Sequence, residues 1–210
     1  ALATLALAGA ARADVQTSEQ WDTPRATRRS GFSVGGELGA GVLSIAGFPN
    51  DPKKIGYQSY YTETGVRPGT WLALWLGGAF NDWLSFGVGF GASSMFATDQ
   101  GEKVTCAALL FHVEGFPFEP FTGGHLRDLG LALDAGTGPV NVDDRTGKTP
   151  LVEGGAASLV GATVFYEGIR FWRVGSGPFM AANYMFSDSA RRPAFFIGYR
   201  AALYAGVFGR

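Results

Sequence analysis

The sequence predicts an all-β fold, and more closely an eight-stranded antiparallel up-and-down transmembrane β-barrel. Apolar residues recur at every second position in segment after segment, which is typical of strands rather than helices. The opposite face of most segments consists of Gly, Ala and Ser, and 32 of the 210 residues are glycine, roughly twice the ordinary share. The links between segments alternate between long and short. Together these observations favour a narrow barrel.

Composition excludes several other classes of protein. Hydrophobic residues make up 46% of the chain and aromatic residues 14%, which is enough to form a core and argues against disorder. The 17 Lys and Arg nearly balance the 18 Asp and Glu, so the chain lacks the positive charge of a nucleic-acid binder. Cys106 is the single cysteine, which excludes an internal disulfide framework and a multi-cysteine metal site.

The first residues have the pattern of an export signal. Residues 1–13 are an apolar run that ends in Ala11-Arg12-Ala13, an arrangement that signal peptidase cleaves. We therefore expect a truncated signal peptide over 1–13, a polar periplasmic lead-in over 14–30 and an outer-membrane barrel over 31–210. The lead-in contains Arg25, Arg28 and Arg29, and the sequence leaves open whether it plugs the barrel or lies at the lipid headgroups.

Most of the expected strands alternate cleanly between an apolar face and a face of small or polar residues. The apolar face should meet lipid, where a charge would cost about 2–4 kcal/mol at the midplane. The other face suits the inside of an eight-stranded barrel, which leaves room for side chains and little else. The segments with this pattern are 32–43, 83–93, 106–115, 128–136, 157–167 and 195–208.

Two further segments are expected to be strands with a less certain facing. Segment 70–80 is apolar on both faces: a two-residue turn at Asn81-Asp82 would direct its leucines inward, and a three-residue turn would direct them outward. Both possibilities stay open. In segment 172–184, two glycines and Pro178 predict a bulge in the middle of the strand.

The connections predict how the barrel is oriented. Outer-membrane barrels have short periplasmic turns and long extracellular loops, which would place both termini in the periplasm. The long links are 47–69, 96–103, 137–152 and 185–193, and the short ones are 81–82, 116–127 and 167–171. Aromatic residues near the strand ends are expected to form interfacial girdles. They are Trp71, Trp83, Tyr166, Trp172 and Tyr184, with Phe32, Phe171 and Phe195 beside them.

This pattern resembles the small eight-stranded bacterial outer-membrane barrels, of which the OmpA transmembrane domain and the OmpX family are examples. The likeness rests on the alternating strands and on the C-terminal run FFIGYRAALYAGVF, with Tyr204 and Phe208 near its end. The chain departs from the pattern by ending on Gly209-Arg210. The resemblance implies a monomer in the outer membrane of a Gram-negative bacterium, in contact with lipid and lipopolysaccharide, and with no cofactor.

The alternation also directs most acidic and basic strand residues into the lumen. A buried charge without a partner is costly, so the acids and arginines should meet in an ion-pair network that fills the barrel. Cys106 is expected to be a small lumen residue. The predicted network consists of Glu37, His112, Glu114, Asp128, Asp134, Glu167 and Arg200, joined by Arg173 and Asn183.

A filled lumen favours a non-enzymatic role, either structural, in surface interactions or as a minor, porin-like pore. The alternative is a lipid-modifying barrel enzyme of the lipid A deacylase or palmitoyltransferase type. Ser85, His112 and Glu114 fall on lumen faces and form a conceivable nucleophile cluster. That cluster would lie near the periplasmic turn, however, whereas a lipid hydrolase of the outer leaflet needs its nucleophile at the other end. A palmitoyltransferase would instead need inward leucines around an acyl chain.

Other features carry weaker hypotheses. Asp143-Asp144 lacks the spacing of a calcium loop, and no metal site is expected. The loop 47–69 contains several tyrosines and lysines, which suit an extracellular partner or glycan but are explained equally by interfacial packing. A soluble secreted β-sandwich that binds a ligand remains the third possibility.

Overall fold

A computed structural model describes residues 29, 31–96, 102–121, 125–147 and 149–205. The expected signal peptide over 1–13 therefore lies outside the described residues, as does the expected lead-in over 14–30 apart from Arg29. Residues 206–210, which include the terminal Phe208 and Gly209-Arg210, lie outside them as well.

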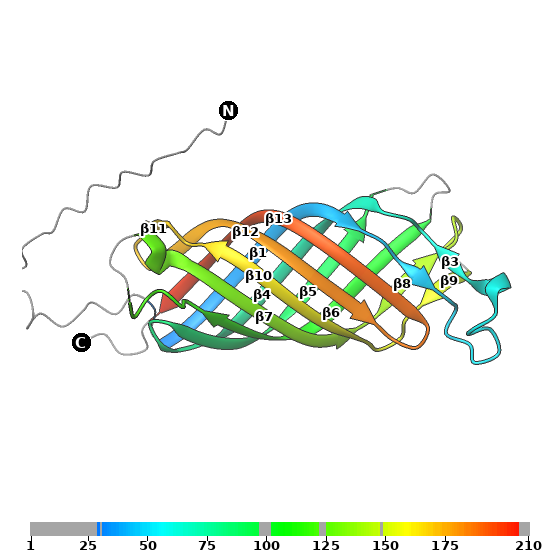
Figure 1. Ribbon diagram of the computed structural model, residues 1–210, viewed down its shortest axis with the longest axis horizontal. Helices are drawn as coiled ribbons and strands as arrows, with labels where there is room; N and C mark the ends of the chain where they lie inside the picture. The colour runs from blue at the N-terminus through cyan, green and yellow to red at the C-terminus, as the bar shows by residue number, and fades with distance from the viewer. Residues whose placement is uncertain (1–28, 30, 97–101, 122–124, 148, 206–210) are drawn as a thin grey trace, which may run out of the picture.

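In the described part of the chain, eight long antiparallel strands form a closed barrel (Figure 1). Each long strand pairs with the next one along the chain, and the last pairs with the first. The predicted eight-stranded up-and-down barrel is thus confirmed. In ring order the strands are β1 (Gly31–Leu43), β4 (Arg67–Asn81), β5 (Leu84–Met95), β6 (Lys103–Gly115), β7 (Leu129–Gly138), β10 (Ala157–Tyr166), β12 (Val174–Phe186) and β13 (Ala190–Ala205).

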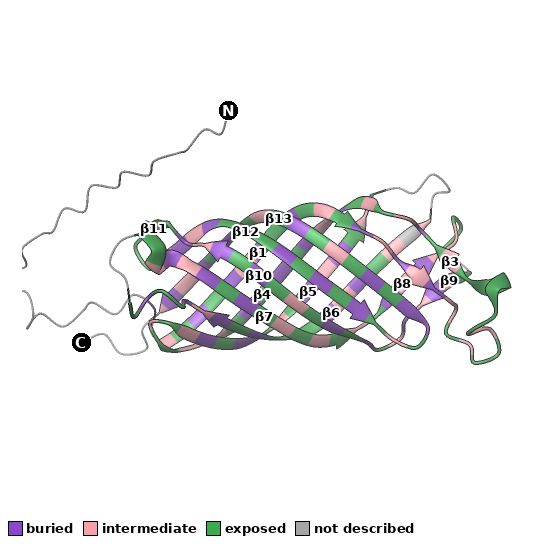
Figure 2. Cartoon of the chain, in the orientation of Figure 1, coloured by how far each residue is buried: buried purple, intermediate pink, exposed green. Residues whose placement is uncertain are grey.

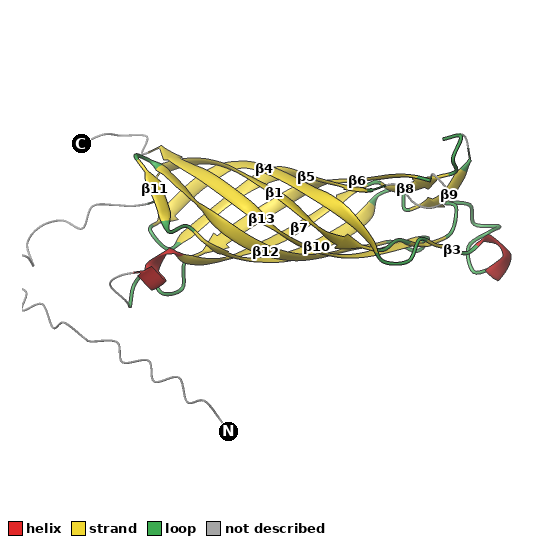
Figure 3. Cartoon of the chain, turned by 90° about the horizontal axis from the view of Figure 1, so that it is seen from above, coloured by secondary structure: helices red, strands yellow, loops and turns green. Residues whose placement is uncertain are grey.

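The two ends of the barrel differ (Figures 1 and 3). At the terminal end, β1 begins and β13 ends, and this end also carries β11 (Ile169–Phe171) and the short 3-10 helix η3 (His125–Asp128). At the opposite, loop end, short strands extend the wall beyond the barrel. The elements of the loop end are β2 (Ala46–Gly47), η2 (Gln58–Tyr60), β3 (Thr62–Glu63), β8 (Val140–Asp143) and β9 (Pro150–Glu153).

Buried and exposed residues alternate along every long strand (Figure 2). On β1, Ser33 and Glu37 point into the barrel, whereas Val34 and Leu38 point outward, and Leu38 is 65% exposed. This is the facing that the period-two pattern predicts for this strand. Within the described residues, no helix is long and apolar enough to cross a bilayer.

The structure decides the facing of β4. Asp82 and Trp83 form a two-residue turn, but a bulge between Ala79 and Asn81 adds a residue ahead of it. The added residue reverses the facing that the turn alone would impose, because a one-residue shift moves every side chain to the other face. The three leucines at positions 72, 74 and 76 consequently face outward. The expected interfacial position of Trp71 is wrong, since its side chain is inside the barrel and 4% exposed.

The predicted bulge in β12 is also wrong. This strand pairs with β13 in one continuous register from Val174 to Phe186. The irregularity lies on the neighbouring side, where residues 166–168, at the end of β10 and before β11, stand opposite only residues 177–178 of β12. The glycines and Pro178 of β12 therefore mark a bulge in the strand that faces them.

One expected loop is mostly strand. The link 185–193 was predicted to be long, but β12 continues to Phe186 and β13 begins at Ala190, so that only residues 187–189 connect them. Arg192, which would belong to a polar loop, instead lies on the inward face of β13 and is buried.

Side chains fill the lumen in layers. An apolar cluster toward the loop end joins inward residues of the long strands to residues of β8 and β9. A second, aromatic cluster that includes Trp71 and Phe165 occupies the next part of the barrel. Inward glycines make room for these rings: a Cβ on Gly35 would lie 2.3 Å from the ring of Trp75, and one on Gly130 would lie 2.2 Å from the ring of Phe165.

Candidate functional site in the barrel lumen

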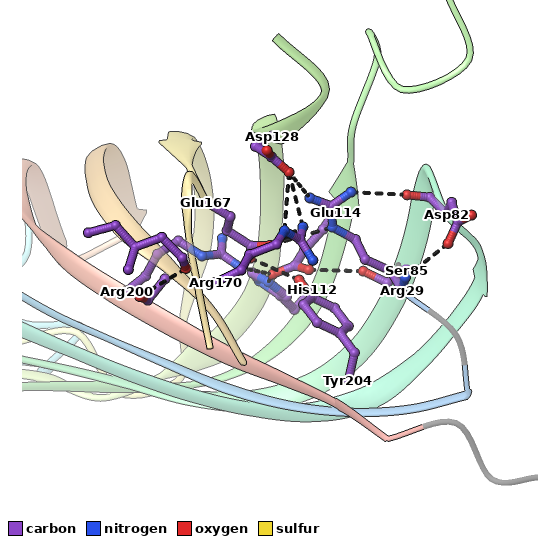
Figure 4. A network of polar contacts seen from close by, with 12 residues as sticks. Arg29, Asp82, Ser85, His112, Glu114, Asp128, Glu167, Arg170, Arg200 and Tyr204 are labelled. Carbon is purple, nitrogen blue, oxygen red and sulfur yellow. Dashed lines mark hydrogen bonds and ion pairs between the residues drawn. The ribbon is translucent and has the colours of Figure 1, made fainter. Parts of the chain in front are cut away.

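A network of buried charged side chains occupies the half of the lumen nearer the terminal end (Figure 4). Glu114 of β6 is at its centre. The Ser85 hydroxyl donates to Glu114 Oε2 at 2.9 Å, His112 Nε2 lies 2.9 Å from Glu114 Oε1, and Arg200 Nη2 donates to the same Oε1. Strand alternation explains the proximity of Ser85 and Glu114, because these two inward residues are directly paired on β5 and β6.

His112 connects two carboxylates. Its Nδ1 lies 2.6 Å from Asp134 Oδ1 and its Nε2 lies 2.9 Å from Glu114 Oε1, and its ring packs on Trp75 at 4.5 Å between centroids. An ionised carboxylate only accepts hydrogen bonds, so both ring nitrogens donate when both acids are charged, and the imidazole then carries a positive charge.

Arg200 is the main cation of the network and is fully buried. Besides Glu114, its guanidinium lies 3.2 Å from Glu167 Oε1 and 3.7 Å from Glu37 Oε1. The plane of the group lies over the ring of Phe165, 3.5 Å from the centroid. Three carboxylates and an aromatic face suit a guanidinium, which offers five donors in one plane and is weakly hydrated.

Glu37 has fewer contacts than the other acids. The indole nitrogen of Trp71 donates to Glu37 Oε2 at 3.4 Å, and Glu37 stands directly opposite Arg200 in the register of β1 and β13. Its Oε1 accepts no hydrogen bond within the described structure. This acid is therefore the more loosely held partner of Arg200.

The network continues to the terminal end through a second set of ion pairs. The Tyr204 hydroxyl donates to Glu167 Oε1 at 2.8 Å. Arg29 and Arg170 both reach Asp128, with nitrogen–oxygen distances of 3.2 and 3.1 Å, and both also lie near Glu167 Oε2. The seven principal members of the predicted network, from Glu37 to Arg200, thus join one connected cluster, whereas Asn183 and Arg173 lie outside it. Arg29 and Arg170, which the alternation did not identify, complete it.

Comparison with known proteins supports the fold only. No protein-family model and no curated protein matches the sequence. Among solved structures, Neisserial surface protein A (NspA) is similar with a TM-score of 0.54 and 13% identity, over 84% of this chain and 98% of that one. The outer-membrane protein OprG from Pseudomonas aeruginosa aligns over the same shares of the two chains, with 11% identity and a TM-score of 0.41.

The chain therefore has the fold of a small outer-membrane β-barrel. At 13% identity, the likeness to NspA carries the architecture of the barrel and transfers none of its residues. What the lumen of this barrel does must be argued from its own side chains.

A separate polar group lies deeper in the barrel. Arg192 is fully buried and donates to Asn183 Oδ1 at 2.6 Å and to Ser93 Oγ at 2.7 Å. Sequence reasoning placed Asn183 in the lumen but missed Arg192, although its even number gives it the same facing as Arg200 on β13. The expected inward position of Arg173 is wrong: this residue is exposed at the terminal end, against Trp172.

The remaining aromatic candidates lie at the ends of the barrel. Trp83 is in the turn between β4 and β5, and Trp172 stands between β11 and β12 with 78% of its surface exposed. Tyr166 ends β10 at the terminal end and is half-buried, whereas Tyr184 points outward from β12 nearer the loop end.

The cluster of Ser85, His112 and Glu114 lacks the geometry of a nucleophile and its base. A nucleophilic serine needs a hydrogen bond to the base, yet Ser85 donates to Glu114, and both nitrogens of His112 face carboxylates. An acyl-binding interior is not supported either, because the leucines at 72, 74 and 76 face outward. In the described residues, no group of His, Cys, Asp or Glu is arranged to hold a metal ion.

Proposed function

We propose that this protein is an integral barrel of the bacterial outer membrane, with both termini in the periplasm and the loop end outside the cell. The outward faces of the long strands are apolar along their middle parts, and the closed ring of strands leaves no unpaired edge, as a bilayer requires. Where the structure describes their side chains, the charged residues of the long strands lie inside or, like Arg191, near the loop end. The short connection at Asp82-Trp83 supports the periplasmic placement of the terminal end.

We further propose that the barrel is a non-enzymatic, closed structure that anchors its loops at the cell surface. The observation that carries this proposal is the ion pair between Arg200 and Glu114, which crosses the lumen between opposite walls. Beyond it, the apolar cluster at the loop end includes Ile45, Val142 and Val152, none of which is exposed. A charged layer, an apolar layer and the buried group around Arg192 fill the described lumen with packed side chains, which supports a closed barrel.

The loop end offers the surface for interactions. The tyrosines at positions 57, 60 and 61 are exposed on and around η2, and Lys54 lies 5.7 Å above the ring of Tyr60. Exposed aromatic side chains suit contact with an extracellular partner, and a lysine ammonium suits the phosphate groups of lipopolysaccharide. The barrel itself needs no second copy to bury its strands, which supports a monomer.

Fractionation and conductance measurements test this proposal. We expect the protein in the outer-membrane fraction. Its migration on a gel should change on heating, because a stable barrel stays folded in detergent until it is heated. In planar bilayers the purified barrel should give no large and stable conductance steps. Recovery as a soluble periplasmic protein would refute the membrane assignment, and steady conductance would refute the closed lumen. If the protein does not modify lipids, the composition of lipid A should be identical in cells with and without it.

A further inference from the structure

The side chain of Arg29 enters the opening of the barrel at its terminal end, which we call the terminal mouth (Figure 4). Arg29 precedes β1, yet its side chain is 1% exposed and reaches acids that belong to other parts of the ring. Its Nη2 lies 3.2 Å from Asp128 Oδ1 and its Nε lies 3.4 Å from Glu167 Oε2. Its Nη1 donates to the carbonyl oxygen of Asp82 at 3.4 Å, and its backbone N–H donates to the Asp82 carboxylate at 2.9 Å.

The mouth also provides flat apolar surfaces for the same guanidinium. The central carbon of Arg29 lies 3.4 Å from the centroid of the Phe116 ring, and the ring of Tyr204 is 6.0 Å away. Phe116 is fully buried. Stacking on a ring while donating in plane to several oxygens is a property of guanidinium, whereas an ammonium is a compact and strongly hydrated point charge.

We propose that the terminal mouth is a guanidinium-binding site, which Arg29 fills in the folded chain and which admits a guanidinium ligand when that side chain is absent. Asp128 and Glu167 supply the charge, the Asp82 carbonyl supplies an acceptor, and Phe116 supplies the stacking surface. This inference goes beyond the closed-barrel function and holds whether or not the barrel conducts.

The charges of the mouth explain why the vacated site would attract a cation. Arg170 contacts the same two acids as Arg29, with an Nη2–Asp128 distance of 3.1 Å and an Nη2–Glu167 distance of 3.7 Å. Without Arg29, these acids lose one of the positive charges that face them, in a place largely shielded from water. A ligand that restores both the charge and the stacking on Phe116 is therefore favoured over one that restores the charge alone.

Access to Ser33 reports whether the mouth is filled. Ser33 is an inward residue of β1 close to Gly31 and is buried next to the mouth. We would replace it with cysteine in a Cys106→Ala background and measure its modification by a cationic methanethiosulfonate reagent. Adding Arg29→Ala should accelerate the reaction by about tenfold, equivalent to about 1.4 kcal/mol of lost protection. Arg191→Ala, which removes an exposed arginine of the loop end, should not change it.

Rescue by small cations distinguishes a binding site from a simple plug. In the Arg29→Ala protein, millimolar methylguanidinium should restore protection of the cysteine, whereas methylammonium at the same concentration should not. Replacing Phe116 with leucine in this background should weaken the rescue. Arg29→Lys, which keeps the charge and disturbs the fold less, should protect poorly and should also respond to methylguanidinium.

Three results would overturn the proposal. Modification that is equally fast with and without Arg29 would show that this side chain does not close the mouth. Equal rescue by methylguanidinium and methylammonium would show that only charge matters. Rescue that is independent of Phe116 would remove the stacking surface from the site. Heat-modifiable migration of each variant verifies that the barrel has formed before access is measured.

Discussion

Arg200 and Glu114 form an ion pair across the whole width of the barrel. They belong to β13 and β6, which have three strands between them in either direction around the ring. Arg200 is also the direct cross-strand neighbour of Glu37, yet that pair is separated by 3.7 Å and includes an oxygen without a hydrogen bond. Arg200 thus pairs more closely with an acid on the opposite wall than with its direct neighbour in the sheet.

Replacing Glu114 should destabilise the barrel far more than replacing Glu37. Glu114→Ala leaves Arg200 and His112 without their common acceptor, and breaking a buried ion pair costs about 3–5 kcal/mol. Glu37→Gln removes one weaker contact and keeps a group that accepts from Trp71. Urea unfolding in lipid vesicles measures both changes. Similar free energies of unfolding for the two variants would contradict the central role of Glu114.

Gly130→Ala should destabilise the barrel, because the added methyl group would lie 2.2 Å from the ring of Phe165. Forcing extra volume into a packed core typically costs about 1–3 kcal/mol. Gly78→Ala is the matched control, since the nearest atom to its added Cβ is 3.5 Å away. A Gly130→Ala barrel as stable as the Gly78→Ala barrel would show that the lumen is loosely filled.

Leu74→Arg tests the outward facing of β4 and the bilayer environment together. Leu74 is 54% exposed in the middle of this strand, and an arginine on the lipid face at the midplane costs about 2–4 kcal/mol. Val66→Arg, just outside β4 at the loop end, should change the free energy of unfolding by less than about 0.5 kcal/mol. If the two arginines were equally tolerated, the outer face of β4 would not contact hydrocarbon.

Cys106 should not react with maleimides while the barrel is folded. Its side chain is 2% exposed within the apolar cluster of the loop end, and thiol chemistry requires access. Labelling should become complete after unfolding in denaturant. A cysteine introduced by Ser59→Cys, in the exposed turn of η2, provides the control and should label in the folded barrel. Rapid labelling of native Cys106 would show an open path from the loop end.

Much of the barrel follows from the spacing of residue types. The alternation of Phe32, Val34 and Leu38 with Ser33 and Glu37 determines which face of β1 is inside, because successive strand residues point to opposite faces. The same period places Glu37, Glu114, Asp134, His112 and Arg200 in the lumen. Asp128 and Glu167 face the lumen too, but from η3 and from the residue that follows β10. The alternation of inward and outward positions alone therefore predicted most members of the charged network.

The alternation of inward and outward positions does not carry across a bulge or into a segment that reads as a loop. The facing of Trp71 stayed open in the sequence because it depends on the number of residues at the turn, and one bulge residue ahead of the Asp82-Trp83 turn decides it. Arg192 was missed because its neighbourhood has the composition of a loop, although pairing with β12 makes it strand. Arg29 lies outside any alternating segment, so its spacing carries no information about where its side chain goes.

What the sequence by itself determined is the class of fold and most of the side chains that face the lumen, since both depend on a local period of two residues. Only the tertiary structure decided which of them meet. Glu114 and Arg200 are 86 positions apart along the chain, and they come together because closure of the ring brings β6 opposite β13. Residues that share a strand face are specified locally, whereas partners across a barrel are specified by the number, tilt and register of all its strands.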